Sequence, residues 1–320
     1  MIQIQDILNA YKTVQPIVHK TPLMQSHALD EKTGNAVFFK CENFQKVGAF
    51  KIRGAYNKIA SLSAEQKAKG VVAFSSGNHA QGVALASRLL GTTSKIVMPD
   101  NSPKSKMEAT RAYGAEVIVY DFLKEDREAI GKRISESEGR TLVPPFNDEY
   151  IMAGQGTVSV ELAEQISDLD YAFIPCGGGG LLSGNAVALK HFYPHIKVVG
   201  VETDTANDAY QSFNKGEIVK IAPPPTIADG MRTLALGDKT FPVIRRYVDA
   251  MLTVSDHAVI EAMYWIYSRL KIVVEPTAAV PFAAVMQNTL QLRGKKIAVI
   301  LSGGNIDLDD FFELLKRQAA

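Results

Sequence analysis

Short apolar runs alternate with helix-like stretches along most of the chain, and this alternation constrains the fold more than any other feature. The runs cover residues 71–74, 95–98, 116–120, 141–143, 171–174, 198–201, 251–254 and 297–301, and stretches of helical length lie between most of them. Strands that alternate with helices are typical of mostly parallel sheets covered by helices on both faces. The sequence therefore predicts an α/β fold.

The proline pair Pro144-Pro145 separates these units into two sets. At roughly 150 residues per domain, a chain of 320 residues is long enough for about two domains. We expect two lobes, each an open twisted mostly parallel sheet, with boundaries near residues 50 and 146. Ligands of such sheets bind beyond the carboxyl ends of the strands, so we expect the active site in the cleft between the lobes.

The charge and the cysteines argue against several classes of protein. The formal net charge is +1, which gives no electrostatic reason to bind nucleic acid or an anionic membrane. Cys41 and Cys176 follow apolar stretches and have no metal-ligand spacing, as is usual for reduced core cysteines of intracellular proteins. The N-terminus lacks a signal-peptide pattern, and no apolar run is long enough to span a membrane. We expect a soluble, cytoplasmic protein.

Lys51 differs from the other lysines in its local sequence. The apolar run 36–39 predicts a buried strand, and residues 49–61 carry apolar side chains at helical spacing, which places Lys51 in the first turn of a helix. The positive end of the helix dipole lowers an amine's proton affinity, as a nucleophilic lysine requires. The alternative is an ordinary exposed lysine.

Four glycines, Gly177, Gly178, Gly179 and Gly180, lie between a predicted strand and a predicted helix. Without Cβ atoms, their N–H groups can close on an anion, and the helix N-terminus that follows favours negative charge. The run therefore predicts a phosphate cradle, and the alternative is a flexible linker. Its spacing is neither that of a dinucleotide fingerprint nor that of a P-loop.

Two further strand ends carry hydroxyl and amide groups. Ser75, Ser76, Asn78 and His79 precede a predicted helix, where free N–H groups can bind a carboxylate or another small anion. The alternative is simple capping of the helix by Ser or Asn. Ser302 follows the last predicted strand and could bond a ring nitrogen of a ligand, unless Gly303 and Gly304 merely form a turn.

Glu202 and Asp208 follow the strand predicted at residues 198–201, with Asp204 between them. Clustered carboxylates suit Mg²⁺, Ca²⁺ or Mn²⁺. The alternative is a solvated acidic loop that caps the next helix, and the residues by themselves favour this second interpretation.

Together and in this order, the motifs are similar to those of one family. The chain resembles the serine/threonine dehydratase and serine racemase family, which uses pyridoxal 5'-phosphate (PLP) on the fold shared with tryptophan synthase β chains. The resemblance extends from Thr21 to Asp307 and rests on residues 39–46, 48–54, 75–81, 153–157, 177–180, 227–230 and 302–307.

The resemblance implies roles for the residues at these strand ends and for Arg127. Lys51 would form the Schiff base with PLP, Gly177 to Gly180 would hold its phosphate, Asn78 would bond the ring hydroxyl and Ser302 the pyridine nitrogen. Ser75, Ser76, Asn78 and His79 would hold the substrate carboxylate, and Arg127 would lie near the substrate. Ser76 also matches the serine that racemases use as acid and base on the face opposite the lysine.

The resemblance also implies a divalent-metal site formed by Glu202, Asp208 and the carbonyl of Ala206. Residues 1–50 and 146–320 would form a larger cofactor-binding domain, and residues 51–145 a smaller, mobile substrate-binding domain. No regulatory domain is expected. A homodimer is expected, and a nucleotide effector at the subunit interface is left open.

The functional prediction is an ammonia-lyase that converts L-threonine or L-serine into 2-oxobutanoate or pyruvate and ammonia. One alternative is a serine racemase with lyase side activity. Another is a 3-hydroxyaspartate dehydratase, because serine, threonine and 3-hydroxyaspartate all carry the β-hydroxyl group that is eliminated. A non-catalytic small-molecule-binding protein would explain the glycine turns, but it gives no reason for Lys51 and Ser302.

Overall fold

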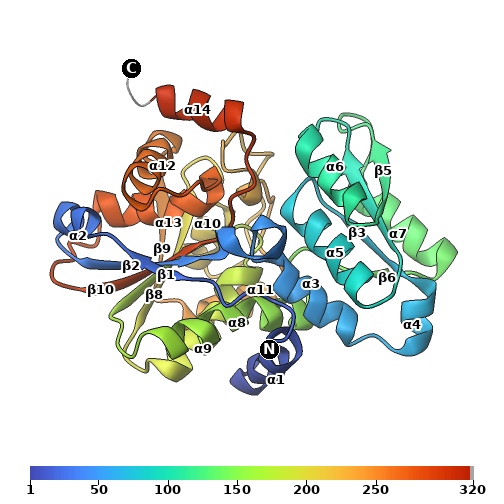
Figure 1. Ribbon diagram of the computed structural model, residues 1–320, viewed down its shortest axis with the longest axis horizontal. Helices are drawn as coiled ribbons and strands as arrows, with labels where there is room; N and C mark the ends of the chain where they lie inside the picture. The colour runs from blue at the N-terminus through green and yellow to red at the C-terminus, as the bar shows by residue number, and fades with distance from the viewer. Residues whose placement is uncertain (318–320) are drawn as a thin grey trace.

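The chain folds into two lobes, each built around its own sheet (Figure 1). The structure is a computed structural model and describes residues 1–317. The larger lobe contains a six-stranded sheet in the order β1-β2-β10-β7-β8-β9, and the smaller lobe contains a four-stranded sheet in the order β5-β4-β3-β6. Only β1 pairs antiparallel with its neighbour among the described strands, which confirms the predicted α/β class with mostly parallel sheets.

The bounds of the elements are as follows. The strands are β1 Leu23–Gln25, β2 Ala36–Cys41, β3 Val71–Phe74, β4 Ser94–Pro99, β5 Glu116–Tyr120, β6 Thr141–Leu142, β7 Tyr171–Pro175, β8 Lys197–Thr203, β9 Ala250–Val254 and β10 Lys296–Leu301. The α-helices are α1 Ile4–Val14, α2 His27–Thr33, α3 Lys51–Ala60, α4 Ala64–Lys69, α5 Asn78–Leu89, α6 Lys104–Ala112, α7 Arg127–Glu138, α8 Glu149–Gln165, α9 Gly180–Phe192, α10 Asp208–Lys215, α11 Thr240–Tyr247, α12 Asp256–Leu270, α13 Pro276–Gln287 and α14 Leu308–Lys316. Short 3₁₀ turns are η1 Glu42–Phe44, η2 Lys46–Gly48 and η3 Asp229–Met231.

Helices cover both faces of each sheet. In the larger lobe, α12 and α13 pack on one face, and α8, α9 and α11 pack on the other. In the smaller lobe, α3 and α5 cover one face and α7 the other. Because strands covered on both faces bury side chains of both orientations, they appear in the sequence as nearly continuous apolar runs.

Several helices depart from the sequence predictions. The helix predicted at residues 123–138 begins at Arg127, because the carboxylate of Asp126 accepts hydrogen bonds from the N–H groups of Glu128 and Ala129 and so caps the helix there. The elements α1, β1, α2, α4, α10 and α11 are not predicted. Most of them have eight residues or fewer, which is too short for a clear periodicity.

The carboxyl ends of β3, β7 and β10 point toward the gap between the lobes, and the residues that follow these strands line a common cavity there. Helix α3 packs on α5 of the smaller lobe and also on α8 of the larger lobe. The division into a large domain and a mobile domain of residues 51–145 stays a prediction. Among residues 1–317, no helix combines the length and the apolar character needed to cross a membrane.

Candidate active site

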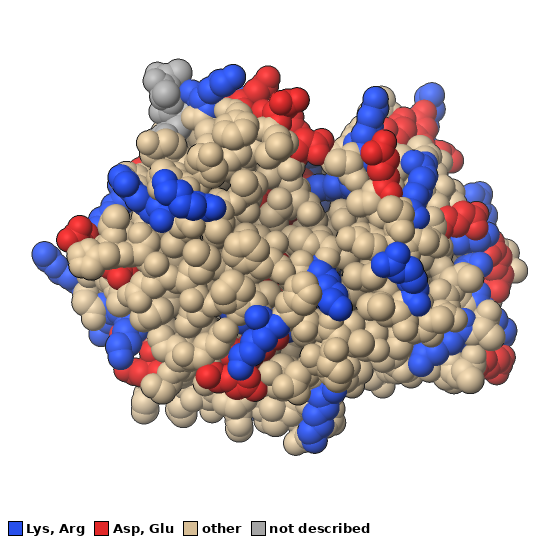
Figure 2. Space-filling model, in the orientation of Figure 1, with Lys and Arg blue, Asp and Glu red and all other residues tan. Residues whose placement is uncertain are grey.

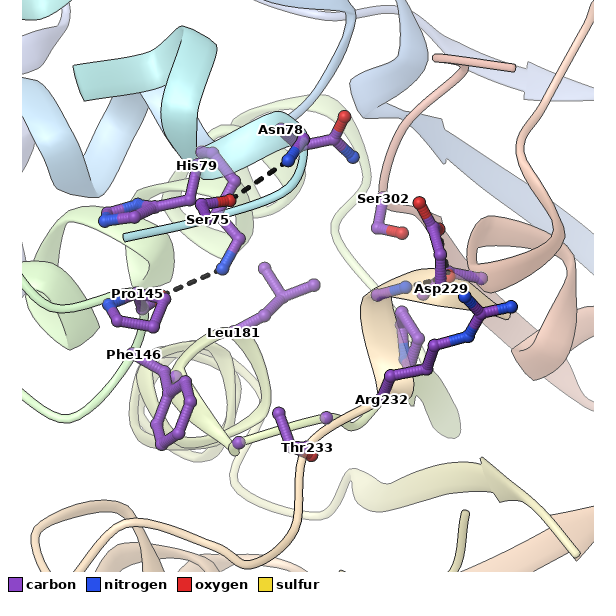
Figure 3. Close-up of a pocket in the computed structure, with 18 of the residues that line it drawn as sticks. Ser75, Asn78, His79, Pro145, Phe146, Leu181, Asp229, Arg232, Thr233 and Ser302 are labelled. Atoms are coloured by element: carbon purple, nitrogen blue, oxygen red, sulfur yellow. Dashed lines mark hydrogen bonds between the residues drawn. The ribbon is translucent and has the colours of Figure 1, made fainter. Parts of the chain in front are cut away.

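A cavity of about 150 Å³ lies between the two lobes. Figure 2 shows the molecular surface notched between the lobes at its upper edge. In Figure 3, Ser75 and Asn78 of the smaller lobe face Ser302, Asp229 and Arg232 of the larger lobe across this cavity. Eleven of the residues predicted from the sequence line it: Lys51, Ser75, Ser76, Asn78, His79, Arg127, Gly177, Gly178, Gly179, Gly180 and Ser302. The fold thus brings these residues together from distant parts of the chain.

Lys51 lies in the first turn of a helix, as predicted, and is the first residue of α3; its Nζ donates a hydrogen bond to the carbonyl oxygen of Pro145 at 2.8 Å. Burial lowers the pKa of Lys51 to about 8, against the opposing effect of Glu275. The helix position of Lys51 predicts a lowered proton affinity from the helix dipole, whereas in the structure desolvation is the main cause. A partly neutral amine inside a cavity can act as a nucleophile or a base.

The four glycines form a packed turn between β7 and α9 and not a flexible linker. A Cβ atom at Gly177 would lie 2.5 Å from the carbonyl oxygen of Gly230, and one at Gly178 would lie 2.3 Å from the ring of Phe146. Gly179 has a φ of +90° and caps α9, a conformation that other L-residues avoid. The glycines are therefore required by space and by backbone conformation, and they leave N–H groups at a helix start free to bind an anion.

The turn before α5 is held by a network of amide and carboxylate groups. Asn78 Nδ2 donates to both carboxylate oxygens of Glu275 at 2.8 and 3.0 Å, and Asn78 Oδ1 accepts from Asn305 Nδ2 at 2.8 Å. Ser75 Oγ accepts from the N–H of Gly77 at 3.2 Å. These contacts fix the orientation of the Asn78 amide beside the cavity.

His79 has a different orientation from the one that a substrate ligand requires. Its Nε2 bonds the carbonyl oxygen of Val143 at 3.0 Å, so Nε2 carries the proton. Burial lowers the pKa of His79 to about 3, and the nearby Lys51 adds to this effect. The imidazole is therefore neutral and does not attract a carboxylate by charge. The group of His79 that can bind a carboxylate is its backbone N–H, in the first turn of α5.

Ser302 fits the predicted role toward PLP. It follows β10, is 1 % exposed, and its Oγ has no hydrogen-bond partner among the described residues. A buried hydroxyl without a partner is costly, so the site needs a group that bonds it. The pyridine nitrogen of PLP is such a group, and the packed glycine turn and the amine of Lys51 complete the set that PLP requires.

Several residues in or beside the cavity are not assigned a functional role from the sequence. Glu275 directly precedes α13, and burial together with Asp229 raises its pKa to about 7. Lys106 of the smaller lobe donates to Asp229 of the larger lobe at 2.6 Å, which closes one side of the cleft. Phe146 and Arg232 also line the cavity. Asp229 lies in a motif that carries the family resemblance, whereas Glu275 follows an apolar pair and precedes a proline, which is a weak signal.

The predicted metal ligands lie together at the end of β8, apart from this cavity. Glu202 and Asp208 are fully buried, and both carboxylate oxygens of Asp208 lack a partner among residues 1–317. Glu202 accepts from the N–H groups of Ala209 and Tyr210 at 3.2 and 2.7 Å. Burial raises the pKa of both carboxyls, that of Asp208 to about 7. The pair is therefore not the solvated acidic loop of the alternative interpretation.

Two buried carboxylates without a cation suit a hard divalent metal. Ala206, also buried, lies between them in the chain. No group of three or more His, Cys, Asp or Glu side chains within the described part of the chain is arranged to hold a metal. Backbone carbonyl oxygen or water would have to complete the coordination.

Comparison with known proteins gives the same assignment. The family model for a pyridoxal-phosphate dependent enzyme matches residues 14–303. The chain is 47% identical to a serine racemase from Schizosaccharomyces pombe over 98% of this chain and 97% of that protein. It is also 47% identical to an L-threo-3-hydroxyaspartate ammonia-lyase from Saccharomyces cerevisiae, over 97% and 95%.

Among solved structures, a maize serine racemase superposes with a TM-score of 0.93 at 44% identity and covers 99% of this chain and 98% of that one. Fold, cavity and sequence thus agree with the resemblance stated from the motifs. The chain belongs to the pyridoxal-phosphate dependent enzyme family.

Proposed function

We propose that this protein is a PLP-dependent ammonia-lyase that converts L-threonine or L-serine into a 2-oxo acid and ammonia. The observation that carries the proposal is the single cavity that gathers the amine of Lys51, the packed glycine turn, the unpartnered hydroxyl of Ser302 and the hydroxyl and amide groups before α5. Each of these groups would bind a different part of PLP or of its amino-acid substrate.

Different residues of the cavity would bind different parts of PLP and of the substrate. Lys51 would hold the aldehyde of PLP, the turn Gly177 to Gly180 its phosphate, Ser302 its pyridine nitrogen and Asn78 its ring hydroxyl. When bound, PLP supplies an electron-withdrawing ring that acidifies the Cα–H bond of an amino acid. The N–H groups and hydroxyls of residues 75–79 would hold the substrate carboxylate, as helix starts do for anions.

Lys51 would act a second time as the general base that removes the Cα proton of the substrate. A pKa of about 8 leaves a substantial fraction of the amine neutral near neutral pH. Ser302 is a neutral partner for the ring nitrogen, which makes the ring a weaker electron acceptor than an acidic partner would. Such a site would favour prompt elimination of the β-hydroxyl group once Lys51 has removed the Cα proton.

Racemisation is the second candidate, because the hydroxyl-bearing Ser76 also lines the cavity. If Ser76 delivers a proton to the face opposite Lys51 before elimination, L-serine becomes D-serine. The serine racemase from S. pombe among the relatives supports this possibility. The two activities would then be competing outcomes of one proton removal.

A dicarboxylic substrate is the third candidate. Arg127 and Arg232 both line the cavity, and the guanidinium of Arg127 stacks over the ring of Phe74 at 5.7 Å. Guanidinium groups bind carboxylates well, so these arginines could accept the second carboxylate of 3-hydroxyaspartate. The S. cerevisiae relative is an ammonia-lyase for this substrate.

The cofactor assignment is tested with purified protein. We expect it to be yellow, and we expect Lys51→Ala to lose both the absorbance of lysine-bound PLP and the formation of 2-oxo acid. Lys58→Ala is the matched control, because Lys58 lies on the same helix but pairs with Asp148 at 2.6 Å outside the cavity. A wild-type protein that binds no PLP would refute the proposal.

The three candidate activities are separated by incubation with L-serine, L-threonine and L-threo-3-hydroxyaspartate. The ammonia-lyase proposal predicts 2-oxo acid as the main product from serine or threonine. D-serine in excess of pyruvate would instead favour the racemase, and Ser76→Ala should then abolish D-serine while keeping pyruvate. A preference for hydroxyaspartate that Arg232→Gln removes would favour the dicarboxylic substrate.

We also propose that Glu202, Asp208 and the Ala206 carbonyl bind Mg²⁺, Ca²⁺ or Mn²⁺ as a structural brace. The buried, unpartnered oxygens of Asp208 support this proposal.

A homodimer is proposed from the exposed aromatic side chains of α12 and α14, where Tyr264 is 40% and Phe312 44% exposed. A nucleotide effector stays a prediction. Light scattering tests the dimer, and the rate of 2-oxo acid formation with and without a nucleotide tests the effector.

A further inference from the structure

A second cluster of ionised side chains lies in the interior, outside the active-site cavity. It consists of Lys40 on β2, Glu42 directly after that strand in η1, Arg53 on α3 and Glu161 on α8. The side chains of Lys40, Glu42 and Arg53 are completely buried, and that of Glu161 is 2% exposed. We refer to these four residues as the buried ion cluster.

Arg53 is the centre of the buried ion cluster. Its Nε and Nη2 donate to the two carboxylate oxygens of Glu42, each at 2.8 Å, in a bidentate pair. Its Nη1 donates to Glu161 Oε1 at 2.8 Å and to Thr157 Oγ1 at 3.3 Å, and its Nη2 also reaches the carbonyl oxygen of His19 at 3.4 Å. The five N–H groups of a guanidinium thus all have acceptors.

Lys40 is satisfied in the same way. Its Nζ donates to Glu161 Oε2 at 2.7 Å, to the carbonyl oxygen of Thr21 at 2.8 Å and to Gln165 Oε1 at 3.0 Å. The hydroxyl of Thr21 donates to Glu42 Oε1 at 2.6 Å. Two cations and two anions therefore form a neutral, hydrogen-bonded group in the protein interior.

Stability alone gives a poor explanation for this arrangement. Moving charges out of water is so costly that apolar side chains of similar size often stabilise a protein equally well or better. Burial opposes the charge of Glu42, yet the guanidinium of Arg53 holds the pKa of that carboxyl below its ordinary value. An ionic group differs from an apolar one because it fixes orientation: a bidentate pair forms in only one relative orientation of its two partners.

The buried ion cluster joins the helix of the catalytic lysine to the larger lobe. Arg53 follows Lys51 by two positions on α3, which is about 200° around a helix, so the two side chains leave the helix on opposite sides. Lys51 points into the cavity, and Arg53 points toward β2 and α8. Rotation or sliding of α3 would move both side chains together.

A close backbone contact reinforces the same junction. A Cβ atom at Gly154 of α8 would lie 2.6 Å from Cα of Gly54 and 2.7 Å from the carbonyl oxygen of Arg53. Helices α3 and α8 therefore touch through their backbones beside the buried ion cluster. Helix α3 also packs on α5 of the smaller lobe, where a Cβ atom at Gly82 would lie 3.1 Å from the carbonyl carbon of Lys51, so α3 contacts both lobes.

We propose that Arg53, through the buried ion cluster, anchors α3 to the larger lobe and thereby positions Lys51 against the glycine turn, independently of any movement of the smaller lobe. Arg53 is thus a positioning residue and not a catalytic one. The part that concerns Lys51 rests on the proposed function, whereas the anchoring of α3 does not.

The anchoring is tested by hydrogen exchange in cofactor-free protein. In Arg53→Met, we expect the amides of residues 55–60 to exchange at least tenfold faster relative to the amides of β10 in the same sample. Phe311→Ala is the control, because Phe311 is buried in the larger lobe against Tyr267 and lies on α14. This variant loses stability without touching the buried ion cluster, so the ratio of exchange rates should stay that of the wild type.

The positioning of Lys51 is tested by the affinity for PLP, measured by fluorescence titration. We expect at least tenfold weaker binding in Arg53→Met, no change in Phe311→Ala, and an intermediate value in Arg53→Lys, which keeps the charge but loses the bidentate pair. Arg53→Lys also serves if Arg53→Met does not fold.

Unchanged exchange ratios in the Arg53 variants would overturn the anchoring. A faster-exchanging α3 with wild-type affinity for PLP would overturn the positioning of Lys51. Wild-type protein that binds no PLP would refute the proposed function and with it the statement on Lys51, while the exchange ratios would still decide whether the cluster holds the helix.

Discussion

The protonation state of Lys51 decides how fast the protein can take up its cofactor, because an amine attacks an aldehyde in its neutral form. Burial lowers the pKa of Lys51 to about 8 from an ordinary 10.5. At pH 7 about one amine in ten is then neutral, compared with about three in ten thousand for an exposed lysine, a difference of about 300-fold. Capture of PLP by cofactor-free protein should therefore become half-maximal near pH 8.

The assay follows the absorbance of lysine-bound PLP after mixing, at a series of pH values from about 6 to about 10.5, which brackets the ordinary and the lowered pKa. The residue to be substituted is Glu275, because its negative charge favours the protonated amine of Lys51. Glu275→Gln should lower the pKa of Lys51 further and move the midpoint below about 8. The ionisation of PLP is common to both proteins, so the comparison isolates Lys51.

Asp307→Asn is the matched control, because Asp307 bonds Ser105 at the cleft and exerts no charge effect on Lys51. It should leave the midpoint unchanged. A rate of capture that still rises beyond about pH 10 would mean a solvated lysine and would contradict the buried position described above. An identical midpoint in Glu275→Gln and the wild type would refute the role given to Glu275.

Three further predictions concern the rest of the cavity and the proposed metal site. Ser302→Ala should weaken PLP binding about tenfold in a fluorescence titration, because one hydrogen bond contributes about 1.5 kcal/mol. Gly177→Ala should abolish binding but keep the circular dichroism of the fold, since its Cβ would lie 2.5 Å from the oxygen of Gly230. Burial raises the pKa of Asp208 to about 7, so the metal-free folded form binds a proton that the unfolded form has lost, and stability should fall as pH rises from about 4 to about 7. Added Mg²⁺ should then raise the melting temperature at about pH 8 more than at about pH 5, and Asp208→Asn should remove this difference.

The strands are predictable from the sequence because their signal is local. Val71–Phe74 and Glu116–Tyr120 form strands with the predicted bounds, since a strand covered on both faces needs consecutive apolar residues. The start of α7 is predicted four residues too early, because the capping carboxylate of Asp126 ends the preceding turn. Local hydrophobicity cannot show that a carboxylate competes for the first N–H groups of a helix.

The cavity residues at strand ends are likewise predictable, because parallel strands bring their carboxyl ends to one edge of a sheet. His79 shows the limit of this reasoning. His79 is next to Asn78 in the sequence, so both are predicted to bind the substrate. One position along α5 rotates the side chain around the helix, however, and the imidazole of His79 points toward Val143. Glu275 bonds Asn78 across 197 residues of chain, and no local pattern signals such a contact.

The sequence by itself determined the α/β class, the strand ends that carry chemistry and, through the resemblance, the family. These depend on residue order and on short-range periodicity. Only the tertiary structure decided that burial lowers the pKa of Lys51, that Ser302 and Asp208 have unpartnered oxygens, and that Arg53 lies in a closed ionic cluster. Desolvation and hydrogen-bond satisfaction depend on what surrounds a side chain in three dimensions, and that is set by packing between segments far apart in the chain.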